Sequence, residues 1–327
     1  MTETRLTIVV PCYKEEEVLA TTNGVLVTLI NQMICSKQIS SSSRILYVDD
    51  GSTDQTWPII QQFSGEYQTV TGLKLSRNFG HQGALLAGLE VAVKKSDCVV
   101  TIDADLQDDP QVIVEFVEAF NQGYEVVYGV RKKRTTDTYF KKNTALFFYK
   151  IMNWLGVELV PNHADFRLLS RKAAKQLLDF PERTMFIRGI VPLLGFSSTE
   201  VYYDRKKREA GESKYPLKKM ISFSIEGLTS FSIAPIKFIL SLGMIALVVA
   251  MIITVYSISR KLLGNTVTGW TSMMISLWVI GGLQLISISI IGLYIGKIFM
   301  EVKQRPRFII EKESFLTSFD ETVEEAE

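Results

Sequence analysis

The chain has 327 residues, and its 36 Lys and Arg residues nearly balance its 35 Asp and Glu residues, which leaves a formal net charge of +1. The length exceeds that of one small domain, and the near-neutral charge gives no reason to expect a nucleic-acid partner. The three cysteines, Cys12, Cys35 and Cys98, have no metal-ligand spacing. We therefore expect neither a disulfide framework nor a cysteine-based zinc site.

Five short apolar segments rich in β-branched residues are predicted to be buried strands, and helical segments alternate with them. The strands are expected at residues 6–10, 44–48, 70–75, 99–102 and 125–129. Pro11 is expected to end the first strand, and residues 12–17 to open a helix with acidic residues in its first turn. This alternation predicts a doubly wound, mostly parallel α/β sheet.

Polar clusters follow four of the predicted strands. They lie at residues 11–15, Asp49 with Asp50, Ser76 with Arg77, and residues 103–107. Gly51 is expected to be the conformationally permissive residue of a tight turn. Because ligands bind outside the carboxyl ends of the strands in doubly wound sheets, these clusters are expected to meet at one edge and form a binding site.

The acidic segment after the fourth predicted strand carries the clearest chemical signal. Asp103 and Asp105 are two residues apart, so on an extended backbone their side chains would share a face, and Gln107 continues the alternation. Neighbouring carboxylates repel unless a cation lies between them, and Mg²⁺ or Mn²⁺ is often held by one or two carboxylates together with substrate phosphates. The alternative is a solvated turn in which Asp108 or Asp109 caps the next helix. Spacing alone leaves both open.

Hydropathy separates a soluble part, residues 1–215, from a membrane part, residues 233–300. Segments 236–258 and 273–299 are nearly free of charge, and each is long enough to cross a ~30 Å hydrocarbon core at ~1.5 Å per residue. We predict two transmembrane helices. Buried core helices are the disfavoured alternative, because the apolar runs are so long.

Interfacial amphipathic helices are expected at residues 139–159 and 216–232, with ordinary packed helices as the alternative. Positive charges flank the two spans, which predicts that both termini are cytoplasmic and that residues 301–327 form a cytoplasmic tail. Gly292 and Gly296 share one helix face, which would allow close helix contact within the chain or between chains of a homo-oligomer.

Six motifs occur in order along the chain. They are residues 11–15 (PCYKE), 49–54 (DDGSTD), 75–83 (LSRNFGHQG), 103–110 (DADLQDDP), 164–168 (ADFRL) and 208–215 (REAGESKY). With them the chain resembles family 2 glycosyltransferases of the polyprenyl-phosphate type, which include dolichol-phosphate mannose synthase and bacterial undecaprenyl-phosphate glucosyl- and N-acetylglucosaminyltransferases. The resemblance extends to about residue 310. It implies a GT-A-type fold and, as in the bacterial branch, a pair of C-terminal membrane helices.

The resemblance also implies roles on the donor side. Asp103, Asp105 and Gln107 would hold Mg²⁺ or Mn²⁺, which neutralises the diphosphate leaving group, and Asp105 counts among the catalytic residues. Further substrate-binding residues are expected at Pro11, Tyr13, Glu15, Asp50 and Arg77. For Tyr13 and Glu15, ordinary helix-start chemistry is the alternative.

On the acceptor side, Arg131 matches the family's Gly-x-Arg and is the candidate for the lipid phosphate, because a guanidinium forms a planar fork onto phosphate. Asp165 resembles the aspartate near the reacting centre. A phosphate monoester is already largely ionised at pH 7, so base and positioning roles both stay open. Arg167 is its expected partner, and a purely structural ion pair is the alternative. A loop that closes over both phosphates is expected to contribute Arg208, Ser213 and Lys214.

The leading hypothesis is a membrane-anchored, metal-dependent, inverting glycosyltransferase. It would move glucose or N-acetylglucosamine from a UDP-sugar to undecaprenyl phosphate at the cytoplasmic face of the plasma membrane, for cell-envelope glycosylation. A processive polysaccharide synthase is disfavoured, because two spans offer little for a polymer channel and no Gln-x-x-Arg-Trp motif is present. A non-catalytic nucleotide-sugar sensor or flippase-associated subunit is the non-enzymatic alternative.

Overall fold

The computed structural model describes residues 3–131, 163–182, 185, 187–204, 234–262 and 269–315. These residues fall into two compact units, each described by itself below. The first is an α/β unit to which both ends of the chain contribute, and the second is a helical unit between residues 217 and 305. The predicted interfacial helices at 139–159 and 216–232 lie outside the described residues.

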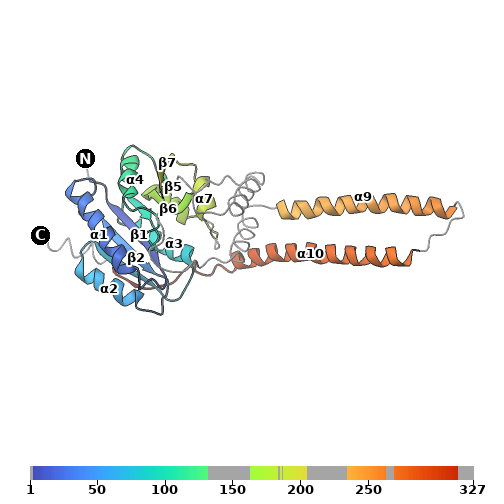
Figure 1. Ribbon diagram of the computed structural model, residues 1–327, viewed down its shortest axis with the longest axis horizontal. Coiled ribbons are helices and arrows are strands. Elements are labelled where there is room, and N and C mark those ends of the chain that lie inside the picture. The colour runs from blue at the N-terminus through green and yellow to red at the C-terminus, as the bar shows by residue number, and fades with distance from the viewer. Residues whose placement is uncertain are drawn as a thin grey trace. The chain divides into compact units, whose positions relative to one another are not determined.

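The α/β unit is built on one mixed sheet of eight strands (Figure 1). They are β1 (Leu6–Cys12), β2 (Arg44–Asp49), β3 (Val70–Leu75), β4 (Cys98–Thr101), β5 (Val126–Arg131), β6 (His163–Ser170), β7 (Ser198–Tyr203) and β8 (Ile310–Glu313). Their order across the sheet is β7-β5-β6-β4-β1-β2-β3-β8, and only β6 and β8 run against the common direction of the others. The predicted mostly parallel α/β sheet is confirmed.

Helices cover both faces of this sheet. They are α1 (Leu19–Cys35), α2 (Thr56–Glu66), α3 (His81–Ala92), α4 (Val112–Asn121), α6 (Arg171–Leu178) and α7 (Ile187–Leu193). Every residue of β1 is buried, because alternate side chains meet helices on opposite faces. Ile8 and Val10 belong to the core cluster that includes residues of α1, whereas Val9 faces α3, where a Cβ on Gly88 would lie 2.4 Å from Val9 Cγ1.

The first strand is longer than predicted and the first helix starts later. Pro11 lies inside β1, in register with Val48 of β2. The Val9 carbonyl accepts a hydrogen bond from the Ile102 amide, so the backbone groups of Val9 point towards β4, and those of Pro11, two residues further on, point the same way. The pairing of β1 with β4 ends at Val9, so no partner strand needs an N–H from residue 11, and proline is tolerated at this position. Residues 12–17 do not open a helix, because Lys14 adopts φ 55° and α1 begins only at Leu19.

Residues 301–327 were predicted to form a tail, but the segment after α10 returns to the sheet and adds a strand to it. β8 pairs antiparallel with β3, and the Ser314 amide donates to the Gly72 carbonyl at 3.1 Å. Phe315 is completely buried. Arg307 donates to the carbonyls of Leu178 and Phe180, at the end of α6. The first part of the predicted tail is thus an edge of the α/β unit, whereas residues 316–327 lie outside the described residues.

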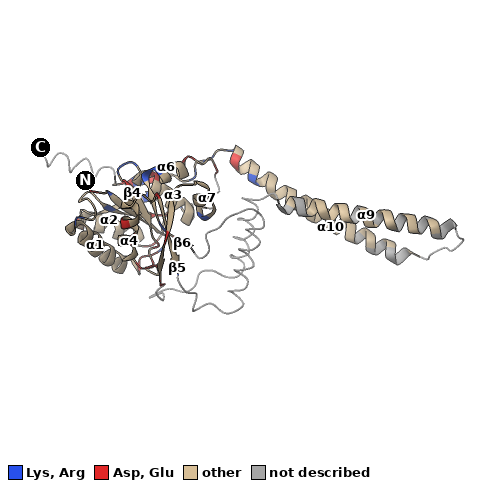
Figure 2. Ribbon diagram, turned by 90° about the horizontal axis from the view of Figure 1, so that it is seen from above, with Lys and Arg blue, Asp and Glu red and all other residues tan. Residues whose placement is uncertain are grey.

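The helical unit contains α9 (Ala234–Leu262) and α10 (Trp270–Val302), which lie side by side in both views (Figures 1 and 2). The predicted spans fall inside these helices. Among the described residues, one segment, Val279–Val302, is long and apolar enough to cross a membrane, and none of the residues in its most apolar stretch is buried within the chain. Of the described neighbours, none would lie within 4 Å of a Cβ on Gly292 or Gly296, so contact between chains through these glycines stays a prediction.

Candidate active site at the carboxyl edge of the sheet

The strands that share one direction end at the same edge of the sheet. Their last residues are Cys12 (β1), Asp49 (β2), Leu75 (β3), Thr101 (β4), Arg131 (β5) and Tyr203 (β7). The predicted polar clusters follow the first four of these residues, so the expectation that they converge on one edge is confirmed. Because β6 runs in the opposite direction, it begins at this edge instead of ending there.

The antiparallel pairing of β6 with β4 brings Asp165 close to the acidic loop. The pairing ends where Thr101 is in register with Arg167, and His81 Nε2 lies within 3.7 Å of both Asp103 and Asp165. The Thr101 hydroxyl donates to the Asp165 backbone carbonyl and ties the two strands together at this point. Two motifs that are 62 residues apart in the sequence are therefore neighbours in the fold.

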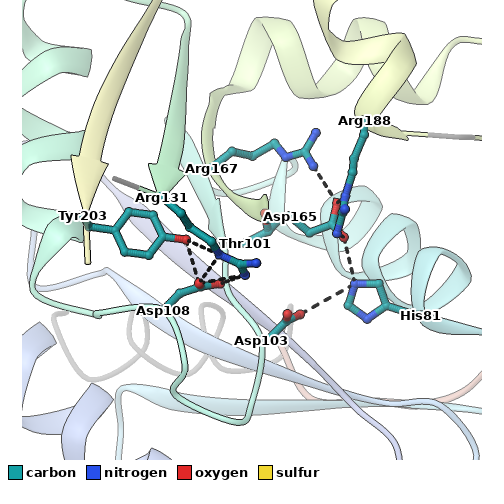
Figure 3. Close-up of polar contacts among 9 residues, drawn as sticks. All are labelled: His81, Thr101, Asp103, Asp108, Arg131, Asp165, Arg167, Arg188 and Tyr203. Carbon is teal, nitrogen blue, oxygen red and sulfur yellow. Dashed lines mark hydrogen bonds and ion pairs between the residues drawn. The ribbon is translucent and has the colours of Figure 1, made fainter. Parts of the chain in front are cut away.

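Asp165 is the centre of a cluster of positively charged side chains (Figure 3). Arg167 Nη2 donates to its Oδ1 at 2.6 Å, which confirms the predicted partner. Arg188, from α7, forms a second, two-pronged pair, with Nε 3.1 Å from Oδ1 and Nη2 2.7 Å from Oδ2. Burial opposes the charged carboxylate, but Arg188, His81 and Arg167 outweigh it and hold the pKa of Asp165 well below its ordinary value.

His81 lies between this cluster and the acidic loop. It is the first residue of α3, and its Nε2 is 3.6 Å from Asp165 Oδ2 and 3.7 Å from Asp103 Oδ1 (Figure 3). Burial disfavours the charged imidazolium, yet the neighbouring carboxylates of Asp165 and Asp103 outweigh burial, so the pKa of His81 is raised. A cationic imidazole at this position lowers the repulsion between two facing carboxylates.

Asp103 and Asp105 were predicted to share a face on the assumption that the backbone stays extended after the strand. The acidic loop is not extended in this way. β4 ends at Thr101, and Leu106 adopts φ 49°. Asp105 Oδ1 accepts from the Gln107 amide at 3.2 Å, and the Gln107 side chain is buried. Asp103 keeps 40% of its side-chain surface exposed. The pair is therefore presented by a turn at the sheet edge.

The chemistry of this loop fits a hard divalent cation. Partial desolvation, which is the largest effect, and the charges of Asp165, Asp108 and Asp105 raise the pKa of Asp103, although His81 opposes the rise. In the described part of the chain, no group of three or more His, Cys, Asp or Glu side chains is arranged to hold a metal. Asp103 and Asp105 supply two carboxylates, and Mg²⁺ or Mn²⁺ is commonly held by one or two protein carboxylates together with substrate phosphates.

A second ion pair fastens the acidic loop to the strands beside it. Arg131 Nε and Nη2 lie 3.2 and 3.0 Å from Asp108 Oδ1, and the Tyr203 hydroxyl donates to the same oxygen at 2.6 Å (Figure 3). Asp108 is only 2% exposed. The N-cap alternative for Asp108 is wrong, because α4 begins at Val112 and Asp108 is instead bonded to β5 and β7. Arg131, the acceptor-phosphate candidate, already has a carboxylate partner.

Asp50, one of the predicted substrate-binding residues, organises the loop that leads into α3. Its carboxylate is buried and accepts from the amides of Phe79 at 2.7 Å and Gly80 at 2.9 Å. Gly51, next to it, has φ +65°, and a Cβ there would lie 2.4 Å from the Arg77 carbonyl carbon, which confirms Gly51 as the permissive residue. The Arg77 guanidinium carbon lies 4.1 Å from the centre of the Phe79 ring.

The other predicted substrate residues differ in accessibility. Tyr13 is 40% exposed just beyond β1, and Lys14 Nζ lies 5.6 Å from the centre of its ring. Pro11 is buried in β1, and the Glu15 amide donates to Thr56 Oγ1 at 3.0 Å. The remaining three lie outside the described residues; they are Arg208, Ser213 and Lys214.

Sequence reasoning missed four side chains of this edge, namely His81, Asp108, Arg188 and Tyr203. His81 stands in a motif that had been noticed, and its position at the start of a helix was the available signal. Nothing local marks Arg188 or Tyr203, since their partners lie 23 and 95 residues away along the chain.

Comparison with known proteins shows the family to which the chain belongs. Residues 7–178 match the family model described as glycosyl transferase family 2. An uncharacterized glycosyltransferase of Bacillus subtilis, YkoT, is 53% identical over 94% of this chain and 91% of its own. A prophage-derived bactoprenol glucosyl transferase of Shigella flexneri is 36% identical over 94% of this chain and 98% of its own. The chain is therefore a glycosyltransferase and belongs to glycosyl transferase family 2.

Proposed function

We propose that the enzyme transfers a sugar, with glucose favoured over N-acetylglucosamine, from a UDP-sugar to undecaprenyl (bactoprenol) phosphate. The observation that carries this proposal is the near full-length similarity to the Shigella flexneri bactoprenol glucosyl transferase, which includes the C-terminal helices as well as the sheet edge. A soluble acceptor would not need Val279–Val302, an apolar segment long enough to cross a membrane.

In the proposed reaction an oxygen of the acceptor phosphate forms a bond to C1 of the sugar while the bond from C1 to the UDP oxygen breaks. The electron pair of that bond leaves with UDP, and direct attack inverts the configuration at C1. Asp103 and Asp105, with Gln107, are the residues that would hold Mg²⁺ or Mn²⁺, which neutralises negative charge on the leaving diphosphate.

The other residues would bind and orient the two substrates. We assign nucleotide binding to the site built by Pro11, Tyr13, Glu15, Asp50 and Arg77. The exposed ring of Tyr13 supports a stacking role, and the bonds from Asp50 to the loop before α3 support a role in holding that site in shape. The acceptor phosphate is assigned to Arg131. Arg208, Ser213 and Lys214 are assigned to a loop that closes over both the donor diphosphate and the acceptor phosphate.

The proposed location is the plasma membrane, with the α/β unit and both termini in the cytoplasm. The pairing of β8 with β3 supports an even number of membrane crossings between them, because a single crossing would leave the two strands on opposite sides. Val279–Val302 would supply one crossing and α9 the other. The excess of Lys and Arg next to the spans supports the cytoplasmic orientation.

The test is sugar transfer by the full chain in detergent micelles. Radiolabelled UDP- and GDP-sugars are each incubated with undecaprenyl phosphate, with and without EDTA. We expect one UDP-sugar to give a lipid-linked monosaccharide, EDTA to abolish it, and Asp103→Ala to lower the rate more than a hundredfold. Asp109→Ala, which removes a carboxylate from the same loop, is the matched control and should keep most of the activity. Nucleotide binding without any transfer would refute the proposal in favour of a sensor.

A further inference from the structure

Helix α1 carries two buried polar side chains, Thr22 and Asn23, on a face that is otherwise apolar. The other buried residues of the helix are all leucine, valine, isoleucine or methionine. A buried polar group costs free energy unless it forms a hydrogen bond, so both side chains require partners. Asn23 Oδ1 accepts from the Tyr47 hydroxyl of β2 at 3.2 Å, and this bond holds the same turn of α1 against the sheet.

Thr22 joins this turn of α1 to the acidic loop. Its hydroxyl oxygen lies 2.6 Å from the Ala104 carbonyl oxygen and 3.0 Å from the Val18 carbonyl oxygen. The Val18 carbonyl already accepts from the Thr22 amide at 3.0 Å, and a hydroxyl has one proton to donate. The proton therefore belongs to the shorter bond, to Ala104. Thr22 is 1% and Ala104 4% exposed, so little water is available to replace the bond.

The carbonyl that Thr22 binds lies between the two candidate metal ligands. Ala104 follows Asp103 directly, and its carbonyl belongs to the peptide group that joins it to Asp105. The loop is also attached at both ends, since the Ile102 amide donates to β1 at 3.1 Å and Asp108 is bonded to β5 and β7. Thr22 adds an attachment between these two points, at the peptide on which the spacing of the two carboxylates depends.

We propose that Thr22 is a positioning residue of the metal site, which holds Asp103 and Asp105 in the arrangement that a divalent cation requires. This inference deepens the proposed function and rests on it. Two neighbouring carboxylates repel each other before an ion binds, and Mg²⁺ demands near-octahedral geometry. A loop that is free to spread must be brought back when the ion binds, which weakens binding. Thr22 acts through the backbone and is not itself a ligand.

The experiment measures binding of Mn²⁺ to the full chain in micelles, by electron paramagnetic resonance of the free ion at saturating UDP. Thr22→Val keeps a side chain of similar size and removes the donor. We expect its affinity for Mn²⁺ to fall by about tenfold, the lower end for loss of a group that orients metal ligands, because the bond is to the backbone. Thr22→Ser retains the hydroxyl and should bind Mn²⁺ within about threefold of the wild type.

Thr71→Val is the matched control for loss of a buried hydroxyl. Thr71 is also 1% exposed and donates to the Ile45 carbonyl at 3.0 Å, but it is the second residue of β3, at the end of the strand away from the carboxyl edge. Both valine variants should lower the unfolding midpoint, whereas only Thr22→Val should lose affinity for Mn²⁺. Thr22→Ala, which also lacks the donor, is the test if Thr22→Val does not fold. Wild-type affinity in the folded variant, or an equal loss in Thr71→Val, would overturn the inference.

Binding is measured without turnover, so this inference and the proposed function can fail separately. Binding of Mn²⁺ that Asp103→Ala leaves unchanged would refute the proposed metal site and the role of Thr22 with it. Absence of sugar transfer by a wild-type enzyme that binds Mn²⁺ through Asp103 would refute the proposed function, and the binding measurements would still decide the role of Thr22.

Discussion

Replacing Asp108 tests whether the bond from the acidic loop to β5 and β7 holds the active-site edge together. In Asp108→Ala, the Arg131 guanidinium and the buried Tyr203 hydroxyl both lose the oxygen that they share at 3.0 and 2.6 Å. Breaking a buried ion pair costs about 3–5 kcal/mol, and because Arg131 is 25% exposed we expect the lower end, about 3 kcal/mol. Asp108→Asn keeps an acceptor oxygen and should lose less.

The loss is measurable as a fall in the thermal unfolding midpoint. For a unit of this size 1 kcal/mol corresponds to about 2–4 °C, so Asp108→Ala should lower the midpoint of the full chain in micelles by about 6–12 °C. Transfer activity should fall as well, because the loop that presents Asp103 and Asp105 loses its attachment. Scanning fluorimetry and the sugar-transfer assay measure the two effects.

Asp97→Ala is the matched control for this prediction. It also removes a carboxylate shared by two arginines, but those groups are more than a third exposed, and exposed pairs contribute about 1 kcal/mol or less. If Asp108→Ala lowers the unfolding midpoint no more than Asp97→Ala does, the idea that the Asp108 ion pair stabilises the site is refuted.

Three further predictions address the backbone, the C-terminal strand and the pH dependence of stability. Gly51→Ala should lower the stability by more than Gly123→Ala, because both positions have positive φ but only at Gly51 would the new Cβ lie 2.4 Å from the Arg77 backbone; equal shifts in the unfolding midpoint would contradict the contact. Phe315→Ala should cost about 3–5 kcal/mol because its side chain is completely buried, and no change in the midpoint would show that this segment is a tail. The pKa of Asp165 is lowered in the folded state, so its ion pairs contribute their full stability above about pH 4, and this contribution is lost as the pH falls further. In melting curves recorded from pH 6 to 3, Asp165→Asn should therefore reduce the fall of the unfolding midpoint at acid pH. An unchanged dependence of the midpoint on pH would refute this prediction.

Local sequence determined five of the eight strands, β1 to β5, and the motifs at the edge of the sheet, whereas β6, β7 and β8 were not predicted. A short run of apolar, β-branched residues is a local feature of the sequence and predicts a buried strand. For this reason β2 and β3 were predicted within one residue of their observed bounds. The tight turn at Gly51 was also predicted from local sequence. Its positive φ and the close Arg77 backbone leave no room for a Cβ. Family resemblance followed from the same short motifs, and the matched family model covers residues 7–178.

Only the tertiary structure decided which side chains meet. Asp165 reaches Asp103 because β6 runs antiparallel to β4, and a strand's direction is set by its partners across the sheet. Arg188 joins Asp165 from a separate helix, and Tyr203 joins Asp108 across 95 residues of sequence. β8 completes the sheet beside β3 although more than 230 residues separate them. These contacts produce no pattern among neighbouring residues of the sequence, because the segments that they join come together only when the chain folds.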